Sequence, residues 1–189
     1  MLSHSVFVVA TIAFGLICLF SSCSHIWNYR AFKDALYSHR VIPTSVAGVA
    51  VVCVIIVELS LSIVAIVSLT FTFIPDYGLW LTGALAGMVF AGYAAYLNYI
   101  RISHNDEPTI CGCGIGEIEV GGETVFRAVA SGTLGLIGFW GITSMKTLLT
   151  MWSGDLFLLI LTGLSLTMLV IWLPVTLWSR RTLLEMVYP

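Results

Sequence analysis

Long uninterrupted runs of apolar residues constrain this chain more than any other feature of its sequence. Charged residues, proline and glycine delimit five of them, at about residues 5–25, 43–73, 78–101, 125–150 and 155–178. Each run has the ~20 residues that a helix needs to cross the hydrocarbon core of a bilayer. We therefore predict an all-α, polytopic membrane helical bundle with about five transmembrane helices, formed as a single integral membrane domain over residues 1–189.

The composition agrees with a membrane protein and narrows the partners. Hydrophobic residues make up 59% of the chain and charged residues 10%, whereas a soluble domain carries roughly 25% charged residues. The formal net charge of -2 and the lack of a basic patch with interleaved aromatic residues argue against nucleic acid. We expect the partners to be the lipid bilayer, other membrane proteins or small redox molecules.

The basic residues predict the orientation, because short loops rich in Lys and Arg stay on the cytoplasmic side. With five crossings, seven of the eight basic residues fall on one side and only Lys146 on the other. The seven are Arg30, Lys33, Arg40, Arg101, Arg127, Arg180 and Arg181. This distribution favours an outside N-terminus and a cytoplasmic C-terminus. The first run lacks the positively charged start of a signal peptide, so we expect it to remain as a helix.

The polar, glycine-rich segment 104–116 contains the residues that most strongly indicate chemistry. It holds Cys111 and Cys113, two of the five cysteines. Thiols one residue apart form a disulfide only with strain, which makes the bond easy to reduce. Such a pair suits reversible redox exchange, although two inert thiols in a reducing compartment are the alternative. A neighbouring cation favours the reactive thiolate, and Arg127 or His104 would supply it.

Glu58 is the only acidic residue deep within an apolar run, where an ionisable group is costly unless it is paired or functional. We expect a protonated carboxyl bonded across helices or a proton acceptor beside a thiol or quinone, with a purely structural carboxyl as the alternative. Cys53 lies in the same run and could sit at the depth of Cys18 on an antiparallel neighbour, extending a thiol relay into the membrane. Small apolar filler is the alternative for both cysteines.

The histidines give little support for a bound metal. His25, His39 and His104 fall near one membrane face with the cysteine pair, but their spacing matches no standard zinc pattern. Solvated histidines at the interface are the ordinary interpretation, and no histidine lies inside an apolar run where it could hold a haem. We expect no metal and no haem, and we leave a quinone open as a redox cofactor.

Two glycine patterns predict close packing between helices. Gly83 and Gly87 lie four residues apart in the third run. In the fourth run, glycines recur at every third position, at Gly132, Gly135, Gly138 and Gly141. Small residues let helix backbones approach closely. We expect these faces to pack against neighbouring helices, with a groove for a lipid tail as the alternative.

Several of these features occur in a recognisable order. The first loop carries aromatic and basic residues over residues 27–33, Pro43 precedes the second run, and Glu58 lies within it. The cysteine pair follows the third run, and Arg127 opens the fourth. This order, over about residues 10–145, resembles the MauE family of DoxX-like, redox-associated membrane proteins.

Two positions depart from the family pattern. Residues 114–116 read Gly-Ile-Gly where the family often has an aromatic residue and then glycine after the second cysteine. Ala128 follows the arginine where asparagine is frequent. The resemblance therefore does not imply the local conformation of this loop.

The resemblance implies a DoxX-like four-helix core plus one further helix, working with a thioredoxin-like redox protein during the maturation of exported proteins. We accordingly predict a bacterial inner-membrane thiol-disulfide oxidoreductase. Cys111 and Cys113 would exchange electrons with the partner, and Glu58, Cys53 and Arg127 would support that chemistry. The alternative is a non-catalytic accessory subunit of a larger membrane complex, such as a respiratory or export assembly, in which both loop cysteines are dispensable.

Overall fold

The structure is a computed structural model, which describes residues 2–70, 76–103, 120–142 and 159–170. These ranges are helical apart from short connections, and no strand occurs in them. The helices are α1 (Leu2–Trp27), α2 (Tyr29–Ser38), α3 (Thr44–Thr70), α4 (Asp76–Ser103), α5 (Gly122–Ile142) and a further helix at Leu159–Val170. The predicted all-α helical bundle is confirmed.

Three helices in the described part of the chain are long and apolar enough to cross a membrane. Their spans are Ser5–Trp27, Ser45–Leu69 and Tyr77–Ser103. The chain is therefore a multi-pass membrane protein. The fourth and fifth predicted helices extend into residues 143–158 and 171–178, which lie outside the described ranges, so the count of five helices stays a prediction.

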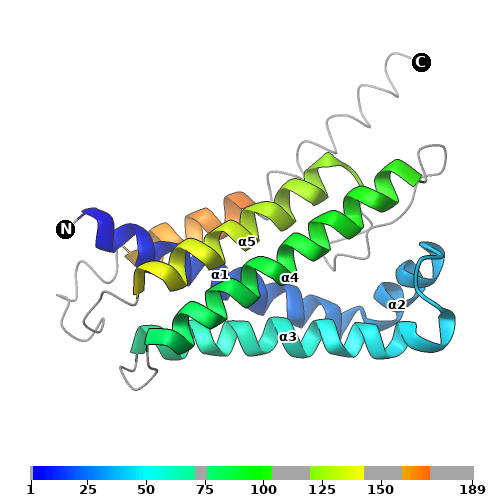
Figure 1. Cartoon of the computed structure of the whole chain (residues 1–189), viewed down its shortest axis with the longest axis horizontal. Helices are drawn as coiled ribbons and strands as arrows, with labels where there is room; N and C mark the ends of the chain where they lie inside the picture. The colour runs from blue at the N-terminus through cyan, green and yellow to red at the C-terminus, as the bar shows by residue number, and fades with distance from the viewer. Residues whose placement is uncertain (1, 71–75, 104–119, 143–158, 171–189) are drawn as a thin grey trace, which may run out of the picture.

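The central helix of the bundle is α1. In Figure 1, α2 lies at the end of the bundle where α4 ends and α3 and α5 begin. Helix α1 packs against both α3 and α5, and α4 packs along α5, whereas α3 and α4 make few direct contacts. The four long helices thus form an arc in the order α3, α1, α5, α4. The two outer helices, α3 and α4, are separated by a space, and α1 and α5 lie beneath it.

Aromatic rings fill the core at the middle of this arc. The Phe14 ring of α1 meets Phe90 of α4 edge-on, with centroids 5.7 Å apart, and meets Phe139 of α5 in the same way at 5.9 Å. All three side chains are buried. Edge-to-face pairs add roughly 0.5–1.5 kcal/mol beyond the burial of their area. These contacts fix α1, α4 and α5 against one another.

Glycines allow these helices to approach closely, as their spacing predicted. A Cβ atom added at Gly132 would lie 2.9 Å from the Cβ of Phe90, and one at Gly135 would lie 2.9 Å from the Phe14 ring. On the facing helix α4, a Cβ at Gly87 would lie 2.7 Å from Leu136. Helix packing, and not an open lipid groove, therefore accounts for these positions.

The first loop contains a helix that the sequence analysis missed. Helix α2 buries Phe32 and Leu36 against Val51 of α3, while Arg30 and Asp34 are exposed on its other face. Its 10 residues are too few to form one of the long apolar runs on which the sequence analysis depended. Because α2 covers the end of α1, it shields His25 and His39 from solvent.

Aromatic and basic side chains mark the two ends of the bundle. Trp80 and Trp140 contact each other in a tilted arrangement at the end opposite α2, with ring centroids 4.3 Å apart, and Trp27 is 89% exposed at the α2 end. Trp80 and Tyr99 lie nineteen residues apart along α4, which corresponds to roughly 28 Å. This spacing is close to the ~30 Å thickness of a bilayer core, at whose interfaces Trp and Tyr concentrate.

Close packing at Gly138 gives a direct test of this fold. A Cβ at Gly138 would lie 2.5 Å from Oγ1 and 2.9 Å from the backbone nitrogen of Thr11, whereas a Cβ at Gly92 meets nothing within 4 Å. We expect Gly138→Ala to lower the free energy of unfolding by about 1–3 kcal/mol, measured by denaturant unfolding in detergent. Gly92→Ala is the matched control and should be neutral or stabilising; equal effects would contradict this packing.

Candidate functional site

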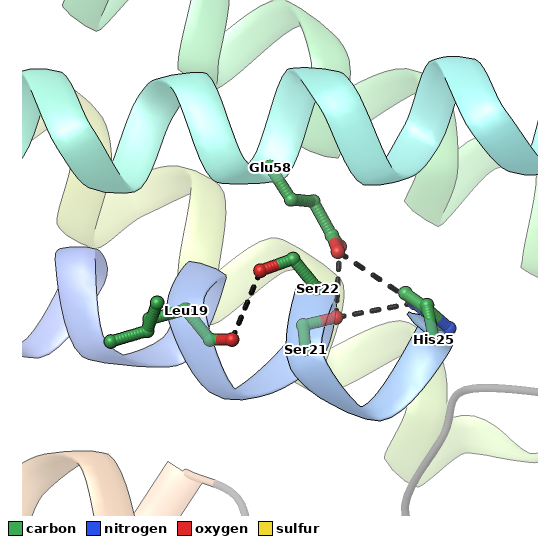
Figure 2. A network of polar contacts seen from close by, with 5 residues as sticks. All are labelled: Leu19, Ser21, Ser22, His25 and Glu58. Carbon is green, nitrogen blue, oxygen red and sulfur yellow. Dashed lines mark hydrogen bonds and ion pairs between the residues drawn. The ribbon is translucent and has the colours of Figure 1, made fainter. Parts of the chain in front are cut away.

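Glu58 projects from α3 toward the C-terminal part of α1 and meets two polar side chains there (Figure 2). Ser21 donates a hydrogen bond from Oγ to Oε1 of Glu58 at 2.9 Å. The Nε2 atom of His25 lies 3.7 Å from Oε2 of Glu58 and 3.3 Å from Oγ of Ser21. The three side chains therefore form a closed triangle, and Glu58 makes the hydrogen bond across helices that its sequence position suggested.

The close contact between α1 and α3 positions this triangle. Ser62 of α3 donates a hydrogen bond to the backbone carbonyl of Gly15 at 2.9 Å, and a Cβ at Gly15 would lie 3.0 Å from Ala65. Ser21 and His25 are four residues apart, which places them on the same face of α1. The closely packed pair of helices thus brings Glu58 of α3 next to Ser21 and His25 of α1.

The structure shows His25 as a buried residue, so its interpretation as a solvated interfacial histidine is wrong. Its side chain is 2% exposed, and its ring stacks on Phe32 of α2, with centroids 4.0 Å apart. Helix α2 excludes solvent from this end of α1. Within the described ranges, Nδ1 of His25 and Oε2 of Glu58 are buried atoms without a hydrogen-bond partner. Such atoms cost about 1–3 kcal/mol each unless a ligand or water satisfies them.

A cavity of about 20 Å³ adjoins Glu58 between the four long helices. All four helices contribute to its wall, which is made of Ile17, Ser21, Glu58, Phe90, Tyr93, Arg127, Ala128 and Ser131. The space exists because α3 and α4, the outer helices of the arc, scarcely touch. Its volume is sufficient for about one water molecule.

Arg127 brings a positive charge to the same cavity. Its half-buried side chain lines the wall, and its guanidinium interacts electrostatically with Glu58 and with Tyr93. When Glu58 is ionised and His25 is neutral, the charge of Arg127 balances that of Glu58, which lowers the cost of burying the group. Two site residues chosen from the sequence, Glu58 and Arg127, therefore share one site.

The cysteines are divided among different environments. Cys111 and Cys113 lie outside the described residues, in a segment that joins Ser103 of α4 to Val120 just before α5. Cys53 is exposed on α3 and does not line the cavity. Its role in the proposed redox chemistry stays a prediction.

The expected pairing of Cys18 and Cys53 in depth is wrong. Cys18 lies midway along α1 between Gly15, which Ser62 of α3 contacts, and Ser21, which Glu58 of α3 contacts, so Cys18 is level with about Leu61 of α3. Leu61 and Cys53 are eight residues apart, so the two cysteines differ in depth by roughly 12 Å of helical rise. The helix register set by Ser62 and Gly15, which sequence spacing alone does not give, causes this difference.

His39 and Tyr96 form a second polar contact that the sequence analysis missed. His39, just after α2, is 1% exposed, and its Nδ1 lies 2.7 Å from the hydroxyl of Tyr96 on α4. The contact joins α2 to α4 at one end of the space between α3 and α4. In the described residues, no three His, Cys, Asp or Glu side chains are grouped as metal ligands would be.

The comparison with family models identifies the family of the chain. The model described as methylamine utilisation protein MauE matches residues 3–144. This chain belongs to the MauE family. The match extends over helices α1 to α5 of this MauE-family protein, over the cavity and over the segment with Cys111 and Cys113. A search of curated proteins and a search of solved structures each found no match.

The hydrogen bond from Ser21 gives a test of the site's geometry. Ser21→Ala leaves Oε1 of Glu58 without this donor, so we expect the free energy of unfolding to fall by about 1–3 kcal/mol. Ser165→Ala is the matched control, because exposed Ser165 donates only to the carbonyl of Leu161 within its own helix. If both variants unfold at the same denaturant concentration as the wild type, the bond between Ser21 and Glu58 does not stabilise the fold.

Proposed function

We propose that this MauE-family protein is a membrane thiol-disulfide oxidoreductase that exchanges electrons with a thioredoxin-like partner during the maturation of exported proteins. Cys111 and Cys113 are the reacting pair. The observation that carries the proposal is that their segment joins the chain at Ser103 and Val120, and that Arg127, seven residues after Val120, lines the cavity together with Glu58.

The length of chain between these residues permits the cysteines to act near Arg127. Cys113 lies seven residues before Val120, a length that spans at most about 24 Å when fully extended. Arg127 is in the second turn of α5. A guanidinium near a thiol favours the thiolate, which is the attacking species in disulfide exchange. Arg127 is therefore the residue of the cavity best suited to activate the pair.

The exchange proceeds through a mixed disulfide. The thiolate of one cysteine attacks a sulfur of the partner's disulfide and releases the partner's other sulfur as a thiolate. The second cysteine then attacks the mixed bond, which leaves a Cys111–Cys113 disulfide and a reduced partner. Two electrons pass to the partner, and the two protons of the original thiols are taken up by its sulfurs. The reverse direction regenerates the dithiol.

The exposed arginines suggest an orientation for the protein in the membrane. Arg30, Arg40 and Arg101 are exposed at the α2 end of the bundle. Because Lys and Arg concentrate on the cytoplasmic side, this end faces the cytoplasm of a bacterial inner membrane in our proposal, with the N-terminus outside. Electrons then pass between the cysteine pair and a partner on the cytoplasmic side. Lys146 and the two C-terminal arginines lie outside the described residues.

Glu58 and Cys53 have supporting roles in the proposal. Glu58 provides a negative charge that holds Arg127 in the cavity wall, through the electrostatic interaction between them. Cys53 is exposed on α3 and stays a candidate second thiol. A non-catalytic accessory subunit is the competing function, and the family description, methylamine utilisation protein, fits a protein that serves other members of a pathway.

Thiol trapping tests the proposal. In intact cells, a membrane-impermeant reagent would alkylate a variant that keeps Cys111 and Cys113 but has Cys18, Cys23 and Cys53 replaced by alanine. We expect labelling only after lysis and reduction, because the pair forms a reversible disulfide on the cytoplasmic side. Labelling of intact cells after reduction by an impermeant reductant would reverse the orientation while keeping the redox function.

The control compares wild type, Cys53→Ala and the double variant Cys111→Ser/Cys113→Ser for the redox state of a trapped thioredoxin-like partner. We expect the double variant to lose the mixed disulfide completely. Free thiols under every condition, together with normal behaviour of the double variant, would refute the redox function and favour the accessory subunit.

A further inference from the structure

The cavity beside Glu58 contains an unusual combination of burial and unmet hydrogen bonding. Glu58 is 8% exposed, and its Oε2 is a buried atom with no hydrogen-bond partner in the described part of the chain. Oε1 accepts its bond from Ser21, so only the second oxygen is left over. A carboxyl oxygen in this state requires a ligand that can donate a hydrogen bond.

From this geometry we infer that the cavity binds one water molecule on Oε2 of Glu58 and that Glu58 is an internal site of proton uptake and release. The inference goes beyond the proposed redox function and does not depend on the cysteines. It rests on the size of the cavity, the polar side chains in its wall and the unmet oxygen. The exchange makes and breaks O–H bonds only: on uptake, the water gives a proton to the carboxylate and receives one in turn from bulk solvent, and release runs in the opposite direction.

The size and wall of the cavity fit a water molecule. A water needs at least about 10–15 Å³ of accessible space and 2–4 polar partners, and the cavity has about 20 Å³. Besides Glu58, the wall includes Ser131, whose Oγ donates to the carbonyl of Arg127 at 2.9 Å and keeps its acceptor capacity. A water that donates to Oε2 of Glu58 and to Oγ of Ser131 would satisfy Glu58 without moving any helix.

The groups around Glu58 make its proton mobile. Helix α1 presents His25 and the thiol of Cys18 to it, α4 presents Tyr93, and α5 presents Arg127. His25 is close enough, at 3.7 Å, to share the proton after a small movement. Glu58 thus has a neighbour that can share its proton and a cation beside the same cavity, which a purely structural carboxyl does not need.

Infrared spectroscopy tests this inference on the full chain in lipid nanodiscs. We expect a carbonyl stretching band from a protonated carboxylic acid that grows as the pH falls, shifts in D₂O and is lost in Glu58→Gln. Glu123→Gln, on the first turn of α5, is the control and should keep the band. Spectra recorded in a Cys111→Ser/Cys113→Ser background separate this result from the fate of the redox proposal. Absence of a Glu58 band at every pH would overturn the inference.

A cavity-filling variant tests the water itself. Ala128 lines the cavity, so Ala128→Val should displace the water and slow the D₂O shift of the band, while Ala130→Val on the same helix lies outside the cavity wall and should not. If Ala128→Val fails to fold, Ser131→Thr adds one methyl group to the same space. An unchanged rate of D₂O exchange in the filled cavity would show that no water in it serves Glu58.

Discussion

An ionisable carboxyl inside a bilayer must be paired, and the pairing of Glu58 organises this protein. The charge is tolerable because α1 brings Ser21 and His25 to it and α5 brings Arg127. That arrangement requires α1 to lie between α3 and α5, close to both, which the small residues on the contact faces allow. The close packing of α1 between α3 and α5 therefore determines both the site and the shape of the bundle.

The arc of helices explains why the polar groups meet a cavity. Because α1 and α5 form the floor and α3 and α4 scarcely touch, side chains from all four helices can face one small space. Helix α2 and the contact between His39 and Tyr96 cover the end of that space nearest the basic residues. The cysteine segment joins the chain at this same end, which is the basis for assigning it a function together with the cavity.

Much of this architecture follows from the sequence, because its signals are local. Apolar runs locate the long helices, and the glycine spacing at Gly135 and Gly138 identifies packed faces. The site was only half predictable. Glu58 and Arg127 are visible as charges in or beside apolar runs, but the burial of His25 depends on α2, a short amphipathic helix. The difference in depth between Cys18 and Cys53 depends on the register between α1 and α3, which the spacing of residues along the sequence does not reveal.

In our proposal, the buried cavity and the cysteine pair work as one unit. The most direct measurement is the rate at which reduced Cys111 and Cys113 exchange with a thioredoxin disulfide, in wild type, Glu58→Gln, Arg127→Gln and the double variant, at equal folded fraction. We expect each single variant to slow exchange and the double variant to slow it by less than the product of the two effects, because both residues act through one cavity. Wild-type rates in all three variants would contradict it.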